Sequence, residues 1–111
     1  MGNSLNNPLV IEPISGVDED NTGLPKTYAL NQNYPNPFNP VTTIEFDLPK
    51  KSDVSLTIYN VLGQKVDEFK GNDMIGHQSF EWDASRFASG IYFYKLETNE
   101  FVDTKKMVLL K

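Results

Sequence analysis

Few side chains in this 111-residue sequence could carry out acid–base catalysis or hold a metal ion. His77 is the single histidine and the chain has no cysteine, which excludes a histidine-pair metal site, a thiolate zinc site and a cysteine nucleophile. Glu81 and Asp83 lie two positions apart on one expected strand, so they share a face, whereas acid–base catalysis needs them facing each other across a cleft. The glycines stand alone and form no phosphate-binding loop. We therefore expect no enzyme activity, no catalytic, cofactor-binding or metal-ligating residues, and no cofactor.

One acidic cluster partly matches a calcium-binding loop. Asp18, Asp20, Thr22 and Gly23 match loop positions 1, 3, 5 and 6, but the position that needs a bidentate glutamate is Ala29. We interpret residues 18–23 as a solvated acidic linker, with calcium binding as the weaker alternative.

Two tyrosines could serve a different kind of chemistry. Strand alternation places Tyr92 and Tyr94 on one face, opposite Phe93. If that face were exposed to solvent, the rings could stack on sugars, as in carbohydrate-binding modules. The favoured interpretation is that both faces of this strand are partly covered, or that the tyrosine hydroxyls reach the rim of the core.

Composition and charge exclude several classes of function. The net charge is −5 and there is no basic stripe with interleaved aromatic residues, so we expect no nucleic-acid partner. No apolar run is long enough to span a bilayer, so we expect no membrane insertion. The first residues lack the charged and apolar regions of a signal peptide.

The most distinctive segment is Asn33–Pro40, which contains three prolines and two aromatic rings. Each proline fixes its own φ and pushes the preceding residue toward extended conformations, so the segment is predicted to run as polyproline II or linked turns. Three residues per turn would give an amide edge for hydrogen bonds and two apolar edges for packing. These edges comprise Asn33, Asn36 and Asn39; Tyr34, Pro37 and Pro40; and Pro35, Phe38 and Val41. We interpret the segment as a stiff structural entry into a β-domain, with an amide ladder that binds a ligand or cation as the weaker alternative.

Two regions are expected. Residues 1–26 read as a linker or N-terminal arm, in which the β-prone Leu9–Ile14 run could add to a sheet edge. From residue 27 to residue 111 the hydrophobic period is two, with polar turns between the alternating runs. The clearest runs cover residues 43–48, 54–59, 64–69, 77–83, 91–96 and 101–111.

This pattern predicts an all-β fold, specifically an immunoglobulin-like antiparallel β-sandwich of about seven short strands. A barrel is the main structural alternative. Because there is no cysteine pair to join two sheets, aromatic packing would have to hold the core together. The candidate core rings are Trp82, Phe93 and Phe46.

The sequence also resembles a known family. The run from Leu30 to Pro40, followed by Thr43–Pro49, closely resembles the opening of the type A C-terminal sorting domain of the bacterial type IX secretion system, also called the Por secretion system sorting domain. The resemblance covers about residues 28–111 without a gap. Further matching segments are Ile58-Tyr59-Asn60 with Gly63-Gln64, Gly76-His77, Trp82-Asp83, Ala88–Tyr92 and Lys105-Lys106-Met107.

The resemblance implies a non-catalytic signal domain that directs an N-terminal cargo through the type IX secretion machinery. The protein would pass through the periplasm and be secreted or held on the outer cell surface. The domain would be recognised in its folded form, with Thr104–Lys111 as an end strand read by the machinery. The residues that match the sorting motif are Asn33, Tyr34, Pro35, Asn36, Pro37, Phe38, Asn39, Pro40, Gly90, Tyr92, Lys105, Lys106 and Met107.

The sequence also suggests a function of a different class, self-association. The protein could be a self-associating surface or filament subunit whose Leu9–Ile14 arm completes a neighbour's sheet. The chain would then be a partner for itself, alongside or instead of the secretion machinery.

Overall fold

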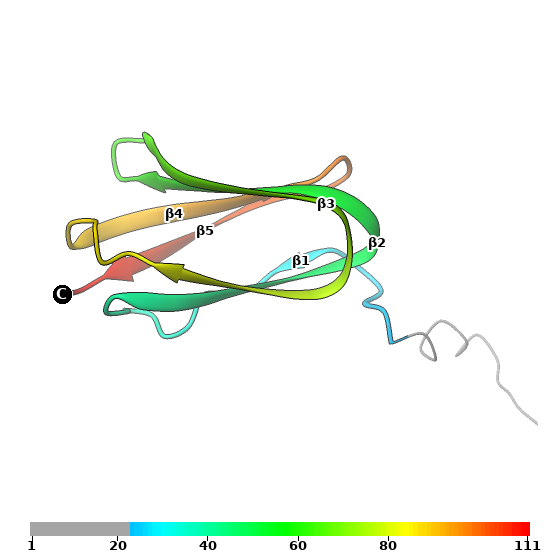
Figure 1. The fold of residues 1–111 in the computed structure, drawn as a ribbon, viewed down its shortest axis with the longest axis horizontal. Helices are drawn as coiled ribbons and strands as arrows, with labels where there is room; N and C mark the ends of the chain where they lie inside the picture. Colours follow the sequence, from blue (N-terminus) through cyan, green and yellow to red (C-terminus); the bar gives the residue numbers. More distant parts are fainter. Residues whose placement is uncertain (1–22) are drawn as a thin grey trace, which may run out of the picture.

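The computed structural model describes residues 23–111, which form five β-strands of one antiparallel sheet (Figure 1). The described residues contain no helix, so the expectation of an all-β antiparallel fold is confirmed. The strand order is β1-β2-β4-β5, and β3 pairs with β2. The strands are β1 (Ala29–Leu30), β2 (Val41–Asn60), β3 (Lys65–Asp83), β4 (Gly90–Glu97) and β5 (Val102–Leu109).

The expected number of about seven short strands is wrong because two pairs of expected strands are continuous. The polar segments 49–53 and 71–76, expected to be turns, lie inside β2 and β3. Their turn chemistry bends a continuous ribbon: the β2–β3 register shifts on either side of Ser52, and Asp73 and Gly76 have φ of 54° and 87°. Figure 1 shows the ribbon curving over at this bend, so that its two arms face each other.

Alternation decides which side chains of β2 are buried. Every second residue points to the interior, as expected for a strand with one covered face. The alternation expected for the runs 43–48 and 54–59 is confirmed, because their large apolar residues are buried in both arms of β2. These residues are Ile44, Phe46, Leu48, Val54, Leu56 and Ile58.

The expectation that Phe93 is a core ring is wrong, whereas the expectation that both faces of β4 are partly covered is confirmed. Tyr92, Tyr94 and Leu96 are buried, and Phe93 is only half-buried. Period two fixes which residues share a face, and here the tyrosine face packs on the interior because Tyr94 finds hydrogen-bond partners there. Tyr92 is 6% exposed and Tyr94 is 0% exposed, so neither ring can stack on a sugar. The carbohydrate-binding interpretation is thereby overturned.

Trp82 is buried in the core, as expected, and it contacts three other aromatic rings. Its ring lies 5.9 Å from Phe38, 5.5 Å from Phe87 and 5.8 Å from Tyr92, measured between centroids. Its indole Nε1 donates a 3.0 Å hydrogen bond to Oδ2 of Asp67. Trp82 and Asp67 lie on opposite arms of β3, so this bond ties the two arms together.

The expected arm Leu9–Ile14 lies outside the described residues, and so does the calcium-loop match apart from Gly23. Strand addition by the arm and calcium binding therefore stay predictions. In the described part of the chain, residues 23–28 lead into β1. The Tyr28 ring stacks on Phe101 at 5.4 Å, which attaches this entry segment to the start of β5.

A double-mutant cycle tests the tie between the arms of β3. We expect Trp82→Phe and Asp67→Ala to be coupled by about 1–2 kcal/mol in the free energy of unfolding. Either substitution alone removes the charge-assisted hydrogen bond of the buried indole, so the double variant loses no more of it than each single variant does. Urea unfolding of the two single variants and the double variant measures this coupling. Additive effects would show that the bond does not stabilise the fold.

Candidate recognition surface

The proline-rich segment Asn33–Pro40 is bound along β5. The backbone N–H of Phe38 donates to the carbonyl of Val108 at 2.9 Å, and the N–H of Leu110 donates to the carbonyl of Phe38 at 3.0 Å. The N–H of Val108 donates to the Asn36 side-chain oxygen at 3.0 Å. A parallel bridge joins Phe38 to Leu109. The segment therefore lies against the last strand although about 70 residues separate the two in sequence.

Asn33 fixes the start of this segment inside the protein. Its side chain is 2% exposed, and its amide Nδ2 donates to Thr42 Oγ1 at 2.9 Å and to the Pro35 carbonyl at 3.2 Å. Thr42 Oγ1 donates to the same carbonyl at 3.0 Å. A buried amide is tolerated only when its polar atoms are paired, and here neighbouring groups pair them.

Tyr94 holds the backbone on both sides of Gln32. Its hydroxyl donates to the Asn31 carbonyl at 2.7 Å and accepts from the N–H of Asn33, also at 2.7 Å. Burial raises the pKa of Tyr94 to about 12, so the hydroxyl stays protonated and can donate at any physiological pH. Gln32 adds a bond from Nε2 to the Lys106 carbonyl at 2.7 Å.

The expected three-edge arrangement of the segment is wrong. Asn33 is buried, Asn36 accepts a bond from β5 and Asn39 is exposed, so these amides do not form one edge. The segment instead makes two isolated bridges, from Tyr34 to Thr43 and from Phe38 to Leu109. The peptide bonds before its three prolines are cis.

The structure brings most of the expected motif residues to one rim of the molecule and divides them into exposed and buried sets. The exposed set can be contacted by another molecule, whereas the buried set can only shape the surface. The exposed residues are Tyr34, Pro35, Asn36, Pro37, Asn39 and Lys106; the half-buried ones are Pro40, Gly90 and Lys105; the buried ones are Asn33, Phe38, Tyr92 and Met107.

Gly90, Tyr92 and Met107 lie behind this rim. Gly90 pairs with Leu109 and Tyr92 pairs with Met107 in the β4–β5 ladder. The Tyr92 hydroxyl donates to the Ala88 carbonyl at 2.6 Å, which fixes the loop before β4. Gly90 has φ of 153°, a value that residues with a side chain rarely adopt.

The end of the chain is attached to the same loop. The Lys111 ammonium donates to the Ser85 carbonyl at 2.6 Å, and the Lys111 N–H donates to Ser89 Oγ at 3.1 Å. Lys105 lies 3.9 Å from Asp103, a weak ion pair. Lys106 carries an exposed side chain on this rim.

His77 is hydrogen-bonded on the surface, as expected for a structural histidine. Its Nδ1 lies 2.6 Å from Asp47 Oδ1, and its Nε2 lies 3.6 Å from Glu45 Oε1. The hydrogen bond to Asp47, together with the charges of Asp47 and Glu45, raises the pKa of His77 above 6.5. Glu45 also accepts a 3.0 Å bond from the Tyr34 hydroxyl, so this cluster reaches the proline-rich segment.

Sequence reasoning missed Tyr94, Thr42 and Gln32 as residues that position the motif. Their partners are up to 74 residues away, and local patterns carry no information about such pairs. A signal did exist for Tyr94: it alternates with Leu96, an apolar residue that would be expected to face the core.

Within residues 23–111, no group of three or more histidine, aspartate or glutamate side chains is arranged to hold a metal ion. The same part of the chain has no helix that is long and apolar enough to cross a membrane.

Comparison with protein families shows which family the sequence belongs to. The family described as the secretion system C-terminal sorting domain matches residues 32–110, which is most of the chain. The chain belongs to this family. It is a C-terminal sorting signal of type IX secretion. The match begins at Gln32 and includes both the proline-rich segment and β5 of the sorting domain.

Comparison with solved structures supports the fold of the sorting domain. The chain is similar to part of the crystal structure of dimeric latent PorU from Porphyromonas gingivalis, with a TM-score of 0.58 and 16% identity. The similarity covers 90% of this chain and 10% of the PorU chain, so the sorting domain corresponds to a small part of that protein. No curated protein matches the chain significantly.

Removing the Tyr94 hydroxyl tests how the proline-rich segment is held. We expect Tyr94→Phe to lower the free energy of unfolding by about 2–3 kcal/mol, because it leaves the Asn31 carbonyl and the Asn33 N–H without a partner at a buried site. Chemical denaturation measures the change. The control is Tyr59→Phe, which keeps the half-buried ring near Lys95 and should change stability little. Equal effects of the two substitutions would contradict this role of Tyr94.

The pH dependence of stability tests the His77 cluster. Because the folded state raises the pKa of His77, its stabilising contribution is complete below the unfolded value of about 6.5 and is lost as pH rises through the folded pKa. His77→Gln should therefore reduce stability more at pH 5.5 than at pH 8.5. The free energy of unfolding, measured at both pH values, checks this prediction. An NMR titration of the single histidine measures its pKa. A His77 pKa at or below 6.5 would contradict the prediction.

Proposed function

We propose that the sorting domain is recognised as a folded, non-catalytic surface, and that this surface is the rim where Asn33–Pro40 lies against β5. The observation that carries the proposal is the direct bonding of the two segments through Phe38, Val108 and Leu110. A partner that contacts the exposed residues of one segment would contact those of the other at the same time. The partner would be a protein of the type IX secretion machinery.

For the fold of the domain we infer an immunoglobulin-like β-sandwich. The support comes from the bend of the β2–β3 ribbon, since each long strand then contributes one arm to each of two facing layers (Figure 1). If each arm of β2 and β3 is counted as one strand, these arms together with β1, β4 and β5 make seven. The contact of Phe69 with Phe80 across the bend, with centroids 3.8 Å apart, is typical of two layers that share a core.

The mechanism we propose is surface recognition without chemistry. The domain would be bound by the secretion machinery after its cargo has entered the periplasm, and the cargo would be carried to the cell surface or the medium. Residues 1–26 would join the cargo to the domain. Exposed residues of the rim, such as Tyr34, Asn39 and Lys106, would make the contacts, and buried ones such as Asn33 and Phe38 would hold the rim in shape.

Export of a reporter tests this proposal. We expect a reporter fused before residue 1 to be exported in a host with type IX secretion, and we expect Asn39→Ala with Lys106→Glu to reduce export at least about tenfold, because a few central contacts dominate most protein interfaces. Both side chains are exposed, so the fold should be unaffected.

The matched control is Asn72→Ala with Lys51→Glu, which makes the same two changes at exposed positions of the β2–β3 bend. Immunoblots of medium and cell fractions measure export, and thermal unfolding of the purified fusions verifies folding. Equal export by the rim variant and the control would refute the proposed surface.

A further inference from the structure

The two rims of the sheet are closed differently. At one rim, the segment from Gln32 to Pro40 connects β2 with β5 through the Tyr34–Thr43 and Phe38–Leu109 bridges. At the other rim lies β3, which within residues 23–111 pairs with β2 alone. The outer edge of β3 therefore has no strand partner among the described residues, over both arms of the bent ribbon.

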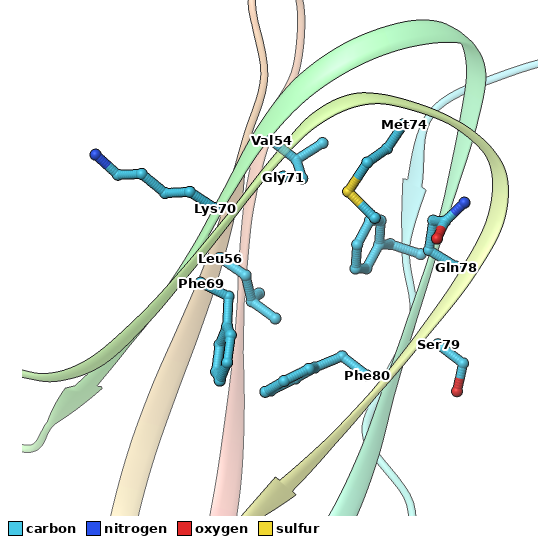
Figure 2. Close-up of a pocket in the computed structure, with 10 residues that line it drawn as sticks. Val54, Leu56, Phe69, Lys70, Gly71, Met74, Gln78, Ser79 and Phe80 are labelled. Atoms are coloured by element: carbon cyan, nitrogen blue, oxygen red, sulfur yellow. The ribbon is translucent and has the colours of Figure 1, made fainter.

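An apolar pocket of about 220 Å³ opens between the arms at this second rim (Figure 2). Figure 2 shows the side chains of Phe69, Met74 and Phe80 directed into the space between the arms, with Leu56 beside Phe69. Phe69 and Ile75 are each 39% exposed, so large apolar side chains remain in contact with water beside an unpaired strand edge. Such an edge is a template for another extended segment.

The described chain begins beside this rim. The Cδ2 atom of Leu24 lies 3.9 Å from the position that a Cβ on Gly76 would occupy, at the bend of β3. Residues that precede Gly23 therefore join the domain near the bend of β3, where the outer edge of both arms is within reach. The proline-rich segment, by contrast, lies at the opposite rim, against β5.

Residues Leu9–Ile14 have the composition of a strand for this edge. Three consecutive aliphatic residues lie between Pro8 and Pro13, and alternation places Leu9 and Ile11 on one face. The eight residues 15–22 connect this run to Gly23. When extended they reach about 26 Å, twice the roughly 13 Å between Gly76 and Phe80 along the strand.

We propose that residues 9–12 of the same chain add as a strand to the outer edge of β3, with Leu9 and Ile11 directed into the pocket between the arms. The backbone groups of the β3 edge gain hydrogen-bond partners, and Phe69 and Phe80 lose contact with water. A short linker gives an effective concentration in the millimolar range, so addition within one chain prevails over exchange between chains at ordinary protein concentrations. This proposal is independent of the rim that the secretion machinery would read.

Amide hydrogen exchange followed by NMR tests the proposal on the full chain. The disrupting variant is Leu9→Asp with Ile11→Asp, and the control is Asn6→Asp with Asn7→Asp, which adds the same charge just before Pro8. We expect amides on the outer edge of β3 to exchange at least about tenfold slower in the unmodified chain and the control than in the disrupting variant. Identical exchange in all three proteins would overturn the proposal.

A spin label provides a second measurement that does not depend on stability. The chain has no cysteine, so Glu12→Cys allows one nitroxide to be attached. We expect broadening of β3 resonances in the labelled chain, unchanged on tenfold dilution. Absence of broadening would overturn the proposal. Broadening that appears only when spin-labelled chains are mixed with separate isotope-labelled chains would also overturn it, in favour of strand exchange between copies.

Discussion

The structure depends on the anchoring of a polar, proline-rich segment to the interior of a β-sheet. Burying backbone amides without partners is costly, so this segment can be packed only where its polar groups are satisfied. Tyr94 of β4 meets that condition for the residues on both sides of Gln32: its hydroxyl accepts from the Asn33 N–H and donates to the Asn31 carbonyl. The side chain of Asn33 meets it locally, through Thr42 and Pro35. With these bonds made, Phe38 can pack on Trp82 in the core.

This anchoring brings two ends of the domain together on one surface. The motif before β2 and the strand β5 become neighbours only after β2, β3 and β4 have placed β5 at the rim. In an unfolded chain the same residues would be far apart and would present no joint surface. A receptor that contacts both therefore selects folded domains, and destabilising the core would weaken recognition without altering any exposed residue.

Alternation in the sequence was sufficient to identify the inward residues of both arms of β2 and the burial of Trp82. It failed where one pattern is compatible with two structures. Polar residues and glycines at 49–53 and 71–76 suit a turn, but they also suit a bend in a continuous ribbon. Alternation in β4 groups Tyr92 with Tyr94 but does not say which face is buried, and the choice rested on hydrogen-bond partners more than 60 residues away.

The chemistry of this rim also limits how another protein could bind to it. Three residues of the segment Asn33–Pro40 are prolines, which have no N–H to donate. The N–H groups of Phe38 and Leu110 are already bonded within the rim, and the N–H of Tyr34 is bonded to Thr43. Few backbone donors are left for an incoming strand, so addition of a strand is a poor way to bind here. A partner of the kind we propose would instead contact side chains such as Tyr34, Asn39 and Lys106. The shortage of free donors also keeps the rim from joining sheets of other chains.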